Sequence, residues 1–298
     1  MSAAPFLAST MAIQAPSHRR PRSLPANMLT IARKELRDAI RSRWFLLYTL
    51  AFACLGLGVS FVSASNLGGA GLAGFGRTSA GLINLVLLVV PLMALTAGAG
   101  SIASDRERGM LPYLLAQPIS RAELLLGKYV GLAATLTTSI SLGFGLCAGA
   151  LAWNGAGADP KRLAILVGLT VLLALAMLSV GLLLSTLARK TSVAIGTAVF
   201  LWLALVFVTD LGLMAGAITF KLSIERLFAL ATVSPLQVFK MWSLQTVDAS
   251  LDVLGPAGLY GQETLGARLN WLFAGVMAAW TIVPLILGVL IFNRRSPV

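Results

Sequence analysis

Charged residues are scarce in this sequence. Asp, Glu, Lys and Arg make up 11% of its 298 residues, whereas a soluble domain carries about 25%. Hydrophobic residues make up 57% of the chain. This composition excludes a soluble fold and predicts an all-α integral membrane protein.

Side chains that perform catalysis or bind metals are also few. The chain has one histidine, His18, and two cysteines, Cys54 and Cys147, which both fall in apolar runs. A histidine-based metal site or proton relay is therefore excluded, and the cysteines are typical of small buried hydrophobes. The only Gly-Lys pair, Gly127-Lys128, lacks the upstream glycine and the following Ser or Thr of a phosphate loop. We expect no catalytic residue, no metal ligand and no cofactor bound directly by this chain.

Six apolar segments are long enough to cross a bilayer, whose core of about 30 Å needs roughly 20 helical residues. They cover residues 44–66, 80–103, 124–153, 163–187, 192–218 and 270–292. The third and fifth exceed one crossing, so we expect their ends to project or tilt. Glycines four residues apart let helices approach closely, and they occur at Gly127/Gly131, Gly145/Gly149 and Gly212/Gly216. The six segments predict one transmembrane domain over residues 44–293.

Two different segments precede the first span. Residues 1–26 are rich in Pro, Ser and Arg, and no apolar run follows the Arg cluster directly, as a signal sequence requires. We interpret them as a disordered cytoplasmic tail. Residues 27–43 place Leu29, Ala32 and Leu36 on one helical face, with basic residues elsewhere. This pattern favours an amphipathic elbow helix in the membrane interface, and the alternative is a solvated helix that simply precedes the membrane.

The distribution of Lys and Arg indicates the orientation of the chain. Most of the 23 fall in the N-terminal region, in the segments after the second and fourth spans, and at the C-terminus. Basic residues gather on the cytoplasmic side of membrane proteins. The sequence therefore predicts that both termini are cytoplasmic, and it accounts for the net charge of +12 without nucleic acid.

The connector between the second and third spans, residues 104–123, is a polar island between apolar runs. It opens with the charged tetrapeptide Asp105-Arg106-Glu107-Arg108. Near its end, Ser120 and Glu123 have the spacing of a capping box, in which each side chain bonds the backbone amide of the other residue. We interpret it as a cytoplasmic connector that docks against a moving partner.

Outside the membrane, residues 219–269 are too apolar for a disordered linker. Ile224, Leu227 and Phe228 suggest one short amphipathic helix, and Ser234-Pro235 begins a second. We interpret the segment as a structured cap on the outer membrane face, and the alternative is a passive loop that closes the topology.

Asp210 is the one acidic residue deep in a predicted span. A carboxylate at membrane depth is costly, so it is a candidate functional group by default. It could face a cavity, bind a substrate cation or hydrogen-bond a neighbouring helix. The alternative places it near the outer interface, within reach of water.

The order of these features resembles a known family. Six spans, an interfacial N-terminal helix and a connector of the form D-R-E-R-G-M-L-x-x-L-L-x-x-P-I-S-R are similar to the ABC-2 type permeases, the membrane subunits of ABC exporters with a type V exporter-like fold. The family's connector typically reads E-R-E-x-G-T-L, and Met110 replaces the threonine here. Within the family, the sequence most resembles the NosY-like permeases of nitrous oxide reductase maturation. That resemblance rests on residues 31–44, on 118–128, and on 210–211 together with 234–240.

The resemblance implies a subunit without covalent chemistry in a bacterial inner membrane. Two copies would form a homodimer in the bilayer with two cytosolic ATPase subunits, NosF-like, which bind ATP and Mg. A NosD-like periplasmic protein would meet the outer cap, and the assembly would serve copper-site construction by moving a sulfur species or by transmitting force. The residues expected to couple to the ATPase are Arg33, Glu35, Asp105, Glu107, Arg108, Tyr113, Leu114 and Arg121. The expected contacts with the periplasmic partner are Pro235, Phe239 and Trp242.

Three competing readings remain open. A general ABC-2 exporter of drugs, peptides or lipids shares the fold and differs in cargo. An intramembrane enzyme would depend on Asp210, although the sequence offers no second catalytic group. A structural membrane scaffold would leave the charged connector without a purpose.

Overall fold

The computed structural model is helical throughout the regular structure that it describes. The described residues are 29–34, 36–37, 49–50, 53, 72–116, 119–153, 160–219, 223–247, 261, 264–266 and 268–294. Five helices are long and apolar enough to cross a membrane, or six if one bent pair counts as a span. These five match the second to sixth predicted spans. The tail 1–26, nearly all of the first predicted span and about half of the elbow helix lie outside the described residues.

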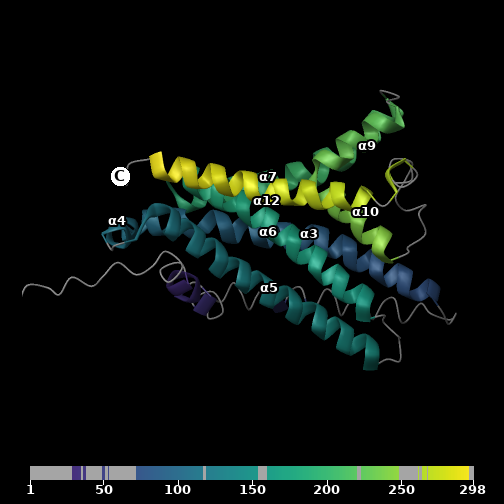
Figure 1. The fold of residues 1–298 in the computed structure, drawn as a ribbon, viewed down its shortest axis with the longest axis horizontal. Helices are drawn as coiled ribbons and strands as arrows, with labels where there is room; N and C mark the ends of the chain where they lie inside the picture. The colour runs from purple at the N-terminus through teal and green to yellow at the C-terminus, as the bar shows by residue number, and fades with distance from the viewer. Residues whose placement is uncertain are drawn as a thin grey trace, which may run out of the picture.

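The long helices run side by side in an elongated bundle (Figure 1). They are α3 (Leu72–Glu107), α5 (Arg121–Trp153), α6 (Pro160–Leu187), α7 (Thr191–Leu203) and α12 (Arg268–Arg294). Helix α3 begins at Leu72, eight residues before the start of the second predicted span at residue 80. Extending an existing helix avoids the cost of nucleating a new one, which explains why a glycine-rich stretch continues α3.

Helix α6 lies at the centre of the bundle and packs against α3, α5, α10 and α12. Its tightest crossing is with α3, where Gly98 faces Gly181. A Cβ atom on Gly98 would lie 2.7 Å from the Leu178 carbonyl oxygen, and one on Gly181 would lie 2.5 Å from the Leu95 carbonyl oxygen. Only glycine fits at these positions, since both contacts are with backbone atoms.

Three glycines of the predicted pairs make no comparable contact with the residues that the structure describes. Added Cβ atoms on Gly145, Gly149 and Gly212 would meet nothing within 4 Å of the described structure. The close crossing depends instead on one glycine from each of two helices, Gly98 and Gly181. A spacing rule applied to a single helix cannot identify such a pair.

The fifth predicted span is one continuous helical span, Thr191–Gly216, with a π-helical turn inside it. Helix α7 passes into a π-helical turn, η1 (Ala204–Val208), which is followed by α8 (Thr209–Ile218). π-helical segments are rare and are frequent at functional sites. The π-helical turn ends two residues before Asp210, so the carboxylate follows an irregular turn of the helix.

Two shorter helices follow the fifth span, as the sequence predicts. They are α9 (Ile224–Val233) and α10 (Pro235–Val247), which meet at 107°. Helix α10 packs against α3, α6 and α12 instead of lying on an outer surface, and Val238 and Phe239 are fully buried. In Figure 1, α9 projects from the end of the bundle opposite α4. Of these two helices, α9 projects from the bundle and α10 packs into it.

Candidate functional site

The polar connector forms a sharp turn at one end of the bundle (Figure 1). Helix α3 ends at Glu107, and a six-residue helix, α4 (Met110–Leu115), begins after Gly109. Gly109 adopts a φ of 68°, a left-handed conformation that glycine reaches without steric cost. Leu111 is buried and fixes α4 against the bundle. The turn thus holds α4 at a defined place beyond the end of α3.

The capping box at the start of α5 is confirmed. The Glu123 amide donates to the Ser120 Oγ at 3.1 Å, and the Ser120 amide donates to the Glu123 Oε2 at 2.5 Å. The carboxylate of Glu123 is buried beside the helix N-terminus, where negative charge is favourable. This local motif sets where the connector ends and α5 begins.

A buried ion pair joins α3 to α5. The Lys128 Nζ lies 2.8 Å from the Asp105 Oδ2, with side-chain exposures of 5% and 21%. Lys128 also donates to the Ser101 carbonyl oxygen at 3.3 Å. Because an ammonium in an apolar helix is costly without a partner, this contact fixes the end of α3 against the first turns of α5.

The next two charged residues of α3 bind the two helix ends at the α6–α7 turn. The Arg106 guanidinium donates to the Ala188 carbonyl oxygen, directly after α6. The Thr191 amide, at the first residue of α7, donates to the Glu107 Oε2 at 3.0 Å. A cation at a helix C-terminus and an anion at an N-terminus are each the favourable sign. Adjacent residues of α3 thus stabilise both ends of one turn.

A fifth contact reaches the C-terminal end of α12. The Arg121 Nη1 donates to the Phe292 carbonyl oxygen at 3.1 Å, within the last turn of α12. We call the set Asp105, Arg106, Glu107, Arg121 and Lys128 the polar clamp. Through it, the connector binds to α5, to the α6–α7 turn and to α12, so the helix ends at this side of the bundle are tied together.

Two large side chains of α4 are exposed to the surroundings, although Leu111 of the same helix is buried. Tyr113 is 66% exposed and Met110 is 44% exposed. Leu114 is half-buried, and Arg108 is exposed at the turn before α4. An exposed aromatic ring beside charged groups, on a rigid support, is a surface suited to contact with another protein.

The structure brings only part of the predicted coupling set together. Asp105, Glu107 and Arg121 belong to the polar clamp and bind other helices of the same chain. Arg33 is exposed on the helical residues 29–34, and Glu35 lies outside the described residues. The coupling role of all these residues stays a prediction.

Sequence reasoning missed two members of the polar clamp, Arg106 and Lys128. For Lys128, a signal was available, because it is a lone cation near the start of an apolar run and such a group needs a partner. Its partner could not be chosen from the sequence. For Arg106, no feature of the sequence distinguishes it from its charged neighbours.

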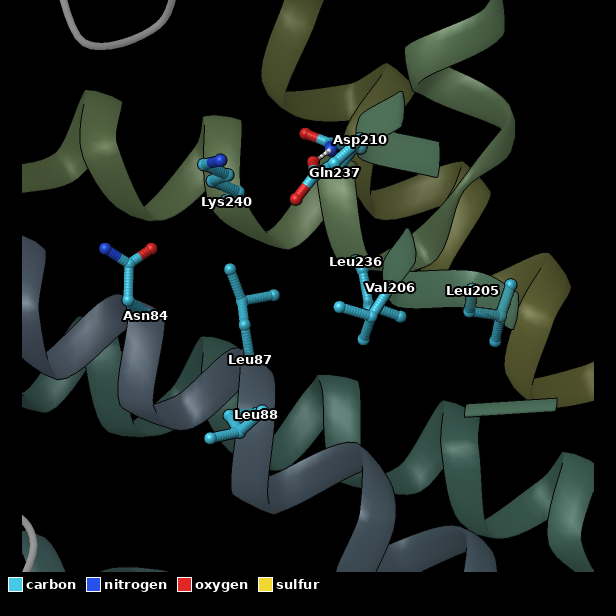
Figure 2. A pocket seen from close by; sticks show the side chains of 9 residues that line it. All are labelled: Asn84, Leu87, Leu88, Leu205, Val206, Asp210, Leu236, Gln237 and Lys240. Carbon is cyan, nitrogen blue, oxygen red and sulfur yellow. Dashed lines mark hydrogen bonds between the residues drawn. The ribbon is translucent and has the colours of Figure 1, made fainter. Parts of the chain in front are cut away.

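Asp210 lies at the other end of the bundle, where α8 meets α10. The Gln237 side-chain amide donates to its Oδ1 at 2.5 Å, and Figure 2 shows the two side chains meeting. This contact fits one of the predicted roles, a hydrogen bond to a neighbouring helix. Among the described residues, no three His, Cys, Asp or Glu side chains gather as they would around a metal ion.

The predicted contacts with a periplasmic partner are placed differently from expectation. Pro235 and Phe239 are buried against the long helices. Trp242 is half-buried, and its ring packs on Phe273 with centroids 6.1 Å apart. Neither Pro235 nor Phe239 offers a surface to another protein in this conformation, because α10 turns its apolar face toward the bundle.

Comparison with known proteins identifies relatives of this chain. Residues 29–296 match the model of the ABC-2 family transporter protein. The chain is 32% identical over 271 residues to a probable ABC transporter permease protein NosY of Stutzerimonas stutzeri, covering 89% of this chain and 97% of that protein. It is 33% identical over 275 residues to the probable ABC transporter permease protein NosY of Pseudomonas aeruginosa, covering 89% and 98%.

Proposed function

The chain belongs to the ABC-2 family of transporter proteins as a NosY-like permease subunit, and on that premise we propose that it couples ATP hydrolysis by a separate ATPase to movements of its own spans. The complex is a homodimer of this chain with two cytosolic NosF-like ATPase subunits, which hold ATP and Mg. The permease itself performs no covalent step.

The observation that carries the proposal is the position of α4 beyond the polar clamp. An ATPase that binds Tyr113 and Met110 pushes on α4, which is anchored through the buried Leu111. The polar clamp then passes this push to α3, α5, the α6–α7 turn and α12 together. Coupling of this kind needs a linked element with discrete arrangements rather than proximity alone.

The π-helical turn η1 in the fifth span is a point at which the helix can bend when the bundle moves. At η1, the regular hydrogen-bond ladder between α7 and α8 is interrupted, and sharp bends of helices occur at such interruptions. We place the hinge at η1, because the clamp fixes the α7 end of this span while the α8 end contacts α9 and α10.

The proposed orientation puts α4 in the cytoplasm of a bacterium, with the chain in the inner membrane and both termini inside. The described basic residues at the α4 end outnumber those at the far end, as expected for a cytoplasmic face. Those at the α4 end are Arg106, Arg108, Arg121, Lys128, Arg189, Lys190 and Arg294.

We propose that the complex functions in assembly of the copper site of nitrous oxide reductase, either by transport or by transmitting force. It is supported by the likeness to two proteins named NosY. The NosD-like partner would bind the projecting helix α9, where Ile224, Leu230 and Val233 are exposed. This refines the earlier expectation, since Phe239 is buried on α10.

Affinity purification of the chain from its native membrane, with mass spectrometry of co-purifying proteins, tests the proposal. We expect an ATPase subunit together with a periplasmic copper-maturation protein. An ATPase alone would support a general ABC-2 exporter of drugs, peptides or lipids. Absence of any ATPase in mild detergent would overturn the transporter mechanism.

A matched pair of variants tests the docking surface on α4. Tyr113→Ala removes an exposed aromatic ring at the proposed ATPase contact, and Trp271→Ala removes one that is 82% exposed on α12 at the far end. We expect the first to lose most of the co-purified ATPase and the second to retain it. Equal retention by both would exclude Tyr113 from the contact.

A further inference from the structure

A polar pocket of about 140 Å³ lies at the far end of the bundle, where α3, the η1–α8 segment and α10 meet. Its floor is apolar and formed by Leu87, Leu88, Leu205, Val206 and Leu236. Four polar side chains lie along one side of this floor, as Figure 2 shows. They are Asn84, Asp210, Gln237 and Lys240.

The two charged groups of the pocket have opposite signs and unused bonding capacity. Asp210 accepts one hydrogen bond, from Gln237, although a carboxylate can accept about four. Lys240 makes no ion pair with any residue that the structure describes, including Asp210. Both charges lie beside an apolar floor, where an opposite charge is attracted more strongly than in open water. The pocket therefore separates two charges that each gain from a partner.

The two opposite charges of the pocket determine which ligand charge it favours. A simple cation would be attracted by Asp210 and repelled by Lys240, and a simple anion would meet the reverse. A ligand that carries both signs satisfies the two groups at once. Gln237 and Lys240 lie three residues apart on α10, with their side-chain origins about 5–6 Å from each other, and Gln237 holds Asp210 by a hydrogen bond. The carboxylate and the ammonium thus line one pocket without pairing with each other, as a short zwitterion that bridges them requires.

We propose that this pocket binds an ammonium–phosphate zwitterion, supplied by the headgroup of a phosphatidylethanolamine-type lipid. The ammonium donates to Asp210, and the phosphate accepts from Lys240 and Asn84. The space of about 140 Å³ is well above the roughly 10–15 Å³ that a single water molecule needs by this measure, so the pocket can admit a polar group of several heavy atoms.

The surroundings of the pocket favour a lipid as the source. Leu88, Phe207 and Leu211 are more than half exposed on the helices that form it. Leu88 also lines the pocket, and Phe207 and Leu211 lie on the η1–α8 segment that helps to form it, so exposed apolar side chains provide a path on the same segments. The glycerol and acyl chains of a bound lipid would lie along this apolar path while its headgroup occupies the polar rim.

Native mass spectrometry of the detergent-purified full chain, with added lipids, tests the site. We expect retention of phosphatidylethanolamine over phosphatidylglycerol, which lacks the ammonium. We also expect retention over phosphatidylcholine, whose quaternary ammonium cannot donate to Asp210. Asp210→Asn and Lys240→Gln should each reduce this preference by about tenfold, the effect of losing one charge-assisted hydrogen bond. Asn at position 210 can still accept from Gln237, so α8 and α10 stay joined.

Two neighbouring residues of α9 provide matched controls. Glu225 and Arg226 are exposed at the same end of the molecule and do not line the pocket. Glu225→Gln and Arg226→Gln change the same charges and should leave the lipid preference as in the unmodified chain. An equal loss in these controls would show general electrostatic binding and overturn the assigned pocket.

The source of the zwitterion is tested by competition with soluble glycerophosphoethanolamine. Failure of this compound to displace the lipid at a large excess supports the lipid, since the acyl chains then contribute to binding. Displacement at similar concentrations supports the zwitterion site and overturns the lipid as its source. Equal retention of all three lipids by every variant would overturn the whole proposal, and ATPase co-purification is scored separately.

Discussion

The carboxylate of Glu107 lies 3.0 Å from the backbone amide nitrogen of Thr191, although the two residues are 84 positions apart. Glu107 is the last residue of α3, and Thr191 is the first residue of α7. The residue before α7, Lys190, provides no side-chain cap. A carboxylate from another helix therefore caps the N-terminus of α7 in place of an N-cap side chain.

This contact separates two variants that the sequence alone treats as equivalent. Glu107→Lys and Arg108→Glu are both expected to uncouple the ATPase partner without unfolding the protein. Glu107→Lys also places a positive charge at the N-terminus of α7, which is the unfavourable sign. We therefore expect a lower melting temperature for Glu107→Lys and an unchanged one for the exposed Arg108→Glu, measured by thermal unfolding in detergent.

The ATPase rate of the reconstituted complex provides the second readout. Normal coupling in both variants would exclude the docking role of this turn. Glu107→Gln serves as the matched control, because its side-chain oxygen can still accept from Thr191. It should keep most of the thermal stability that Glu107→Lys loses.

Breaking the ion pair between Lys128 and Asp105 should be costly. Lys128→Met leaves Asp105 without its cation in a largely buried place, and we expect a loss of about 3 kcal/mol of unfolding free energy. The double variant Lys128→Met with Asp105→Asn removes both charges and should recover much of that loss. A double-mutant cycle of thermal unfolding measures the coupling, and additive losses would show that the pair contributes nothing as a pair.

The close crossing of α3 and α6 predicts a sharp difference between two Gly→Ala variants. Gly181→Ala forces a Cβ to within 2.5 Å of a backbone oxygen, and we expect a loss of about 3 kcal/mol from overpacking. Gly196→Ala in α7 meets nothing within 4 Å and should gain up to about 1 kcal/mol of helix propensity. Similar melting temperatures for the two variants would show that the helices separate without cost.

Disrupting the capping box should cause a smaller and local loss of stability. Ser120→Ala removes the oxygen that accepts from the Glu123 amide, and we expect a loss of about 1 kcal/mol. Ser120→Asp keeps an acceptor at the same position and should retain most of the stability. Thermal unfolding of the two variants side by side distinguishes a cap from a general effect of changing Ser120.

The sequence by itself determined the features that depend on composition and on near neighbours. Apolar runs marked five of the described spans, because burial in lipid depends on the hydropathy of each segment alone. The capping box between Ser120 and Glu123 was predictable for a similar reason, since both hydrogen bonds form within one helical turn. The family resemblance followed from the order of these features along the chain.

Only the tertiary structure decided which distant residues meet. Arg121 binds Phe292, 171 positions away, and Gly98 faces Gly181 across a helix crossing. Such pairs depend on how the helices rotate and slide against one another, and an apolar helix can pack on any face. The burial of Phe239 and the π-helical turn before Asp210 also depend on how the helices pack. Composition and residue spacing do not determine that packing.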